Sequence, residues 1–200
     1  PYFTSHPIHR IFYSIEDQNN HVSQSQKFSS KYTQHSILNA YPTIHAPFKM
    51  SEVNGGGIIQ IQALLKEQMR ILDTDNSIIA ESFDYDALQI KSDHIEYKDL
   101  KAKHIIFSEG FGVSNNPYFK ELPIQGNKGE YLIIKSKSLQ LDAILKNKYF
   151  LIPLGNNLYK YGATYNRDDF TNSPTIKARD EMQEHLDKLL NCDYEIVDQV

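Results

Sequence analysis

The chain contains no tryptophan and only one cysteine among its 200 residues. Cys192 alone can form neither an internal disulfide nor a zinc site made of several thiolates, so we expect a reducing, cytoplasmic environment. No apolar run approaches the roughly 20 residues of a membrane helix, and the first residues lack the basic and then apolar layout of a secretion signal. A membrane is therefore not an expected partner.

Glycine and proline are also scarce, with 9 and 8 residues, and the formal net charge is -4. This composition is that of a globular chain rather than of a disordered or collagen-like one. Because there is no excess of positive charge, nucleic acid is not an expected partner either. Tyrosine and phenylalanine are abundant, with 13 and 10 residues, which is enough to fill a core and leave rings to line a pocket.

The spacing of the apolar residues predicts an α+β fold with a mixed, largely antiparallel sheet and two long helices. The helices are expected over residues 58–73 and 174–191, the second starting at Ser173-Pro174, a capping residue followed by proline. Residues 21–48 are polar, and no regular element is expected there. Strands are expected at residues 8–15, 77–86, 88–90, 94–97, 103–108, 129–135, 149–154, 158–163 and 194–200.

The residues alone show none of the patterns that are usual for catalytic or metal sites. Gly55–Gly57 precede a helix but do not match a phosphate-binding loop, so a flexible hinge is the simpler interpretation. His6 and His9 would face opposite sides of a strand, which argues against a metal site. Asp168 and Asp169 are interpreted as solvated acids of a turn. The residues alone therefore indicate an α+β domain with an aromatic-rich face and identify no catalytic residue.

Several segments, in order, resemble the family of FAD-dependent D-amino-acid, glycine and sarcosine oxidases. His104-Ile-Ile-Phe-Ser-Glu-Gly-Phe-Gly resembles the strand that ends at the flavin, and Leu122-Pro-Ile-Gln-Gly-Asn-Lys-Gly-Glu-Tyr-Leu resembles the strand that follows. Tyr149-Phe-Leu-Ile-Pro and Tyr161-Gly-Ala-Thr-Tyr resemble the strands of a hairpin, and Asp168 to Thr175 resembles the entry to the next helix. The resemblance covers residues 55–200, while residues 1–54 fit by position only.

The resemblance implies an interior piece of a larger oxidoreductase. Residues 1–54 and 113–200 would be two parts of a substrate-binding domain, and residues 55–112 a segment of the FAD-binding domain. The family's G-x-G-x-x-G turn would precede Pro1, and its A-G-x-R-P motif, whose arginine binds the substrate carboxylate, would follow Val200. We therefore expect FAD in a full-length parent, but not its retention by this chain alone.

The resemblance also assigns site residues. Those expected along the FAD are Phe83, Ser108, Glu109 and Gly110. Those expected in the substrate pocket are Lys128, Phe150, Thr164 and Tyr165. Phe150 departs from the family's pattern, because it stands where glycine-oxidase-like members carry a substrate-contacting tyrosine and it has no hydroxyl. No metal ligand is implied.

The leading hypothesis is thus a piece of an FAD-dependent oxidoreductase that oxidises the C–N bond of an amine or amino acid, inactive in isolation. The alternative is a non-catalytic α+β module that binds a small molecule or a protein on its aromatic face. A third possibility is a parent whose flavin serves RNA modification, since some tRNA-modifying enzymes contain a domain of this family. The sequence does not fix the substrate or the oligomeric state.

Overall fold

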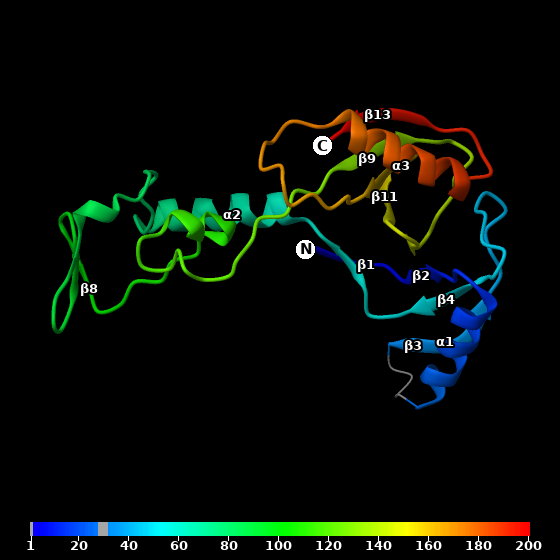
Figure 1. Cartoon of the computed structure of the whole chain (residues 1–200), viewed down its shortest axis with the longest axis horizontal. Helices are drawn as coiled ribbons and strands as arrows, with labels where there is room; N and C mark the ends of the chain where they lie inside the picture. Colours follow the sequence, from blue (N-terminus) through cyan, green and yellow to red (C-terminus); the bar gives the residue numbers. More distant parts are fainter. Residues whose placement is uncertain (1, 28–31) are drawn as a thin grey trace. The chain divides into compact units, whose positions relative to one another are not determined.

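The chain forms two compact units in the computed structural model, which describes residues 2–27 and 32–200. The first, here called the sheet unit, is built from the segments Pro1–Leu65 and Asn127–Val200. The second, here called the hairpin unit, is Lys66–Gly126. Figure 1 labels several elements of both. No helix in the described residues is long and apolar enough to cross a membrane.

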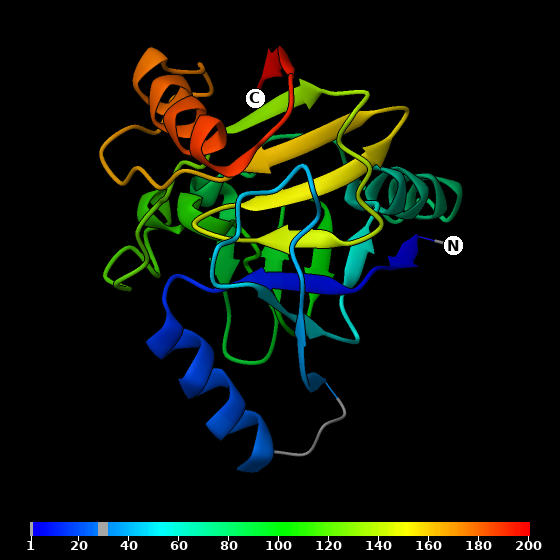
Figure 2. The same ribbon diagram turned by 90° about the vertical axis from the view of Figure 1, so that its right-hand side faces the viewer.

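An eight-stranded sheet, counted over the described residues, dominates the sheet unit. Its strand order is β13-β9-β12-β11-β10-β2-β4-β3, and every pair is antiparallel except β10 with β2. Figure 2 shows β9 to β12 side by side. The expected α+β class with a mixed, largely antiparallel sheet is confirmed. The strands are β2 Ile8–Ile11, β3 Thr33–Leu38, β4 Met50–Val53, β9 Tyr131–Lys135, β10 Ile144–Lys146, β11 Phe150–Gly155, β12 Leu158–Gly162 and β13 Glu195–Gln199.

Helix α3, Ile176–Leu189, covers one face of this sheet and closes the core. Its apolar side chains recur at helical spacing, and they meet the alternate, inward-facing side chains of the strands. The helix is capped by Thr175, whose hydroxyl accepts a hydrogen bond from the Ala178 N–H at 3.2 Å, so the cap lies two residues after the expected Ser173. The core includes Leu132, Ile134, Leu145, Leu151, Tyr159, Tyr161, Ala178, Met182, Leu186 and Leu189.

The first part of the chain differs most from expectation. The strand expected over residues 8–15 ends at Ile11, and helix α1, Ile15–Lys27, follows at once. Its start is fixed by side chains, because Ser14 Oγ accepts from the Asp17 N–H at 3.1 Å and Arg10 pairs with Asp17 at 2.7 Å. A helix of Ser, Gln, Asn and His has little apolar periodicity from which it could be predicted, and its capping and charge pairing become apparent only in the structure.

Strands β1, Phe3–Ser5, and β5, Gly57–Ile59, form a separate antiparallel pair. A Cβ at Gly57 would lie 2.4 Å from the carbonyl oxygen of Thr4 and 2.5 Å from the ring of Phe3. The last of the three consecutive glycines is therefore required by the close approach of the two strands, rather than by a flexible hinge.

The hairpin unit contains most of helix α2, Ile61–Thr74, and a three-stranded antiparallel sheet. This sheet joins β6, Leu88–Ile90, β7, Ile95–Tyr97, and β8, Leu100–Ala102, so the expected hairpin is confirmed and extended by one strand. The strands expected at residues 77–86 and 103–108 are absent, because neither segment has a neighbouring strand with which to pair in the described residues. Two 3₁₀ turns, Tyr85–Ala87 and Gly110–Asn115, complete the unit.

A buried carboxylate connects the ends of several elements in the sheet unit. Glu130, only 3% exposed, precedes β9. Its carboxylate accepts hydrogen bonds from the Thr175 N–H at 2.7 Å, the Thr175 hydroxyl at 2.8 Å and Gln199 Nε2 at 2.8 Å. Burial opposes its ionisation, but these donors and the nearby Lys128 outweigh burial and hold the pKa of Glu130 below its usual value.

Replacing Glu130 by glutamine should destabilise the sheet unit by about 2–4 kcal/mol, because an amide NH₂ would then face the donors that the carboxylate now accepts from. The stabilisation from Glu130 is complete above its unfolded pKa of about 4.3 and is lost as the pH falls through the lower folded value. Urea unfolding of both proteins should therefore show a large gap at pH 7 that closes below about pH 4.

The matched control is Glu184→Gln, on the exposed side of α3, where the carboxylate only pairs with Lys188 one turn away. It should change the free energy of unfolding by less than about 0.5 kcal/mol. Equal effects of the two substitutions, or a gap that does not depend on pH, would contradict the role given to Glu130.

Candidate functional site

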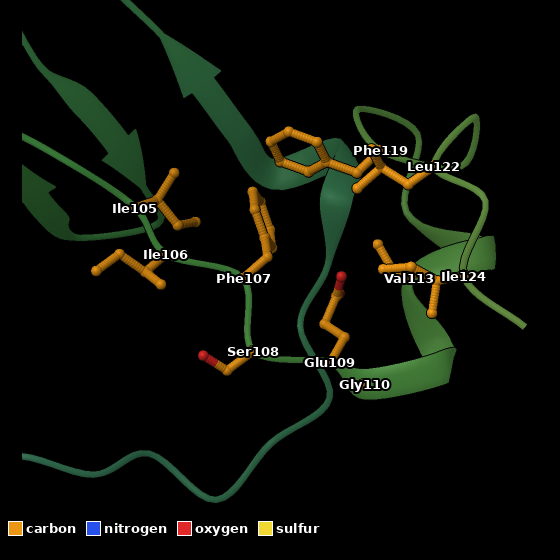
Figure 3. A pocket seen from close by; sticks show the side chains of 10 residues that line it. All are labelled: Ile105, Ile106, Phe107, Ser108, Glu109, Gly110, Val113, Phe119, Leu122 and Ile124. Atoms are coloured by element: carbon orange, nitrogen blue, oxygen red, sulfur yellow. The ribbon is translucent and has the colours of Figure 1, made fainter. Parts of the chain in front are cut away.

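A cavity of about 440 Å³ lies within the hairpin unit, and three of the four residues expected along the FAD line it. Figure 3 shows Ser108, Glu109 and Gly110 on one side, with apolar side chains around the remainder. A cavity of this size is within the range of small-molecule sites, though at its lower end. The apolar part of the wall is made by Ile105, Ile106, Phe107, Val113, Phe119, Leu122 and Ile124.

The carboxylate of Glu109 is the charged group of this cavity, and two side chains fix its position. It accepts a hydrogen bond from Asn116 Nδ2 at 2.7 Å and another from the Tyr85 hydroxyl. Asn116 is fully buried, and its Oδ1 accepts from the Tyr118 N–H at 2.9 Å. The hydrogen bond to Glu109 raises the pKa of Tyr85, so the phenol remains the donor. The carboxylate of Glu109 is thus held in position without any ligand.

Phe83, the fourth residue expected along the FAD, does not line this cavity but contacts a residue that does. Its ring stacks on Tyr97 with centroids 4.4 Å apart and meets the edge of Phe107 at 5.7 Å. Phe107 itself lines the cavity. The structure therefore brings Ser108, Glu109 and Gly110 together, and it connects Phe83 to them through an aromatic cluster.

On the sheet unit, Lys128 is fully engaged with protein groups. Its side chain is 10% exposed, and Nζ donates to Asp169 Oδ2 and to the Ser173 carbonyl, both at 2.6 Å. The hydrogen bond from Lys128 is the largest cause that lowers the pKa of Asp169 to about 2. Asp169, interpreted from the sequence as a solvated turn acid, is thus the partner that fastens the loop before α3 to the start of β9.

The other three residues expected in the substrate pocket lie on opposite faces of the sheet. Thr164 and Tyr165 line a polar cavity of about 420 Å³ beside the start of α3. Thr164 is buried and accepts from the Glu130 N–H at 3.1 Å, whereas Tyr165 is 81% exposed. Phe150 is on the face turned away from α3, since the flanking Tyr149 and Leu151 are buried in the core.

The face opposite α3, here called the open face, carries a second set of residues that sequence reasoning missed. Pairing places Lys146, Phe150, Gly162 and Tyr131 in one row across β10, β11, β12 and β9. The neighbouring row on the same face has Ile152, Lys160 and Ile133. Alternation within each strand could have indicated which residues share a face, but the row depends on β10, which was not expected.

No group of three His, Cys, Asp or Glu side chains that could hold a metal ion occurs in the part of the chain that the structure describes.

Replacing Lys128 by methionine should lower the free energy of unfolding, because Asp169 and the Ser173 carbonyl both lose the ammonium that donates to them. Lys137→Met, at a lysine with no ion pair in the described residues, is the control and should have little effect. Thermal or urea unfolding compares them. A Lys128→Met protein as stable as the unchanged one would contradict the structural role of Lys128.

No family model matches the sequence. Solved structures do match the fold. Glycine oxidase from Bacillus cereus ATCC 14579 matches with a TM-score of 0.74 and 13% identity, covering 99% of this chain and 60% of that chain. Glycine oxidase from Geobacillus kaustophilus matches with 0.77 and 13%, covering 99% and 58%. L-Proline dehydrogenase from P. horikoshii matches with 0.73 and 10%, covering 98% and 59%.

The chain therefore spans about three fifths of the length of these structures. At 10–13% identity the likeness concerns the fold. The resemblance drawn from the sequence is confirmed at that level: the chain has the fold of the glycine-oxidase-like structures over nearly all of its residues.

Proposed function

We propose that this chain is part of an FAD-dependent oxidoreductase that oxidises the C–N bond of an amine or amino acid. The observation that carries the proposal is the match of 98–99% of the chain to the fold of enzymes of this kind. Besides the glycine oxidases and L-proline dehydrogenase, an iminodiacetate oxidase from Chelativorans sp. BNC1 matches with a TM-score of 0.67 and 12% identity. Glycine, proline and iminodiacetate are all amines that bear a carboxylate.

In this proposal the hairpin unit serves the cofactor and the sheet unit serves the substrate. Bound FAD would supply the chemistry by accepting a hydride from the carbon next to the nitrogen. The protein's part is to hold the substrate, orient that carbon and exclude water. Placing the substrate on the sheet unit is supported by the open face, which presents aromatic, apolar and cationic side chains together.

The cavity of the hairpin unit fits only some parts of FAD. A pyrophosphate placed beside the Glu109 carboxylate would be repelled, and no cationic side chain lines the cavity to offset this. Apolar walls and a carboxylate that can accept further hydrogen bonds suit a ring or a ribose hydroxyl instead. Because 440 Å³ cannot enclose the whole cofactor, we propose that this chain alone does not retain FAD or catalytic activity.

The test compares this chain with the protein encoded by the complete reading frame, by visible absorption. The longer protein should show a flavin spectrum after reconstitution with FAD, and the spectrum should bleach without oxygen when glycine, L-proline or iminodiacetate is added. This chain alone should show no flavin. A longer protein without flavin would contradict the proposal and favour a non-catalytic binding module.

A charge substitution then tests the cavity itself in the longer protein. Ser108→Asp adds a second negative charge to the cavity wall and should weaken FAD binding at least about tenfold, which is about 1.4 kcal/mol. Ser114→Asp adds the same charge on an exposed residue that does not line the cavity and should leave FAD affinity unchanged. Equal effects of the two would contradict the assignment of Ser108 to the cofactor.

A further inference from the structure

Two half-buried lysines on the open face have no acidic partner in the described residues. Lys146 lies at the end of β10 and Lys160 lies in the middle of β12, and both are half-buried. Lys128, Lys148 and Lys188, by contrast, each form an ion pair within the sheet unit. A lysine that is partly removed from water and has no carboxylate partner can take an anionic ligand as its counter-ion.

Aromatic rings on the same face supply part of the compensation. Lys146 Nζ lies 4.4 Å from the centroid of the Phe150 ring, and Lys160 Nζ lies 3.7 Å from that of Tyr131. The attraction of an ammonium to a ring face holds each charge in place and leaves its N–H groups able to donate. Within the part of the chain that the structure describes, the single hydrogen bond of these two groups runs from Lys146 Nζ to the Lys148 carbonyl at 3.1 Å.

Gly162 makes the second of these pairs possible. A Cβ at this position would lie 2.8 Å from Tyr131 Cδ1 and 2.8 Å from the Glu130 carbonyl oxygen. The φ of +150° also falls in the range that favours glycine. Without a side chain at Gly162, the Tyr131 ring lies close against β12, which brings it beneath the ammonium of Lys160.

The surroundings leave the two charges uncompensated by protein acids. Asp198 shares the open face through its pairing with Ile133, two strands from Lys160, and no ion pair joins the two. Arg10, on the same face in β2, is already paired with Asp17. Burial lowers the pKa of Lys146, which is the sign of a charge that has lost water without gaining a carboxylate.

We propose that the open face binds a dicarboxylic amine, with one carboxylate at Lys146, the other at Lys160, and its carbon skeleton against Phe150 and Ile152. The proposal names the substrate class within the function proposed above and rests on it. The strands that carry the two rings, β11 and β9, are two strand spacings apart, which is about 10 Å. A diacid of about five carbons, with a charge-assisted contact of about 2.8 Å at each end, spans a separation on the order of this one.

The test uses this chain without FAD, with glutarate as the probe at constant ionic strength, followed by two-dimensional amide NMR. Glutarate should shift the resonances of β9, β11 and β12 around the two lysines. Butyrate, which has one carboxylate, should bind at least fivefold more weakly, and the neutral diamide of glutarate should not bind. Pyrophosphate is titrated in a separate experiment, because the same two cations are also suited to a phosphate of the cofactor.

Four variants locate the binding. Lys146→Met and Lys160→Met each keep an apolar stem over the ring and should weaken glutarate binding at least fivefold, whereas Lys146→Arg should remain within twofold of the unchanged protein. Lys188→Met, at an exposed lysine of α3, is the control and should not change it. Amide spectra and urea unfolding show that each variant is folded.

The proposal would be overturned if glutarate caused no shifts, or only shifts on the α3 side. It would also be overturned if glutarate affinity were unchanged in Lys146→Met and Lys160→Met, or if pyrophosphate bound more tightly than glutarate. Its failure is distinguishable from failure of the oxidoreductase proposal. If the longer protein shows a flavin spectrum but this chain does not bind glutarate, only the proposal of a dicarboxylic substrate is contradicted. Glutarate binding without any flavin would leave a carboxylate-binding module.

Discussion

The buried carboxylate of Glu130 is the interaction on which the arrangement of the sheet unit depends. It accepts from the first turn of α3 through Thr175 and from β13 through Gln199, while its own backbone bonds to Thr164. Lys128, two residues earlier, fastens the loop before α3 through Asp169. A single position at the start of β9 therefore fixes the helix, the edge strand and the end of the hairpin relative to one another.

This constraint also determines what the open face presents. If β9 slipped by one residue, every side chain of the strand would change faces, and Tyr131 would point into the core in place of Leu132. The buried cluster holds β9 in register with β12, so that Tyr131 lies opposite Gly162 and beneath Lys160. Polar groups on the α3 side thus position an aromatic and cationic surface on the other side. Tyr149 and Phe150 show the same division, the first in the core and the second on the open face.

Much of the fold could be read from the sequence where a local signal decides the structure. The two strands of the β11–β12 hairpin were expected on either side of Gly155-Asn156-Asn157, residues that suit a tight turn, and both asparagines take positive φ. Helix α3 was expected from the spacing of Met182, Leu186 and Leu189. In contrast, α1 has almost no apolar periodicity, and residues 103–108 look like a strand but have no partner in the described residues.

The candidate sites divide in the same way. Ser108, Glu109 and Gly110 are contiguous in a recognisable segment, so one motif placed all three in one cavity. Lys146, Lys160 and Tyr131 come from three strands and meet only through pairing across the sheet, which no single segment encodes. Lys128 was given a role at the ligand because its motif was recognised, while its partner Asp169, more than 40 residues away, was not visible in the sequence.

The proposed function requires that residues of this fold contact a flavin in a longer protein. Hydrogen–deuterium exchange of the protein from the complete reading frame, with and without FAD, tests it most directly at the residues concerned. We expect slower exchange at the amides of residues 105–113 when FAD is present, with little change along α3. Unchanged exchange at residues 105–113 in a sample that demonstrably holds FAD would contradict it.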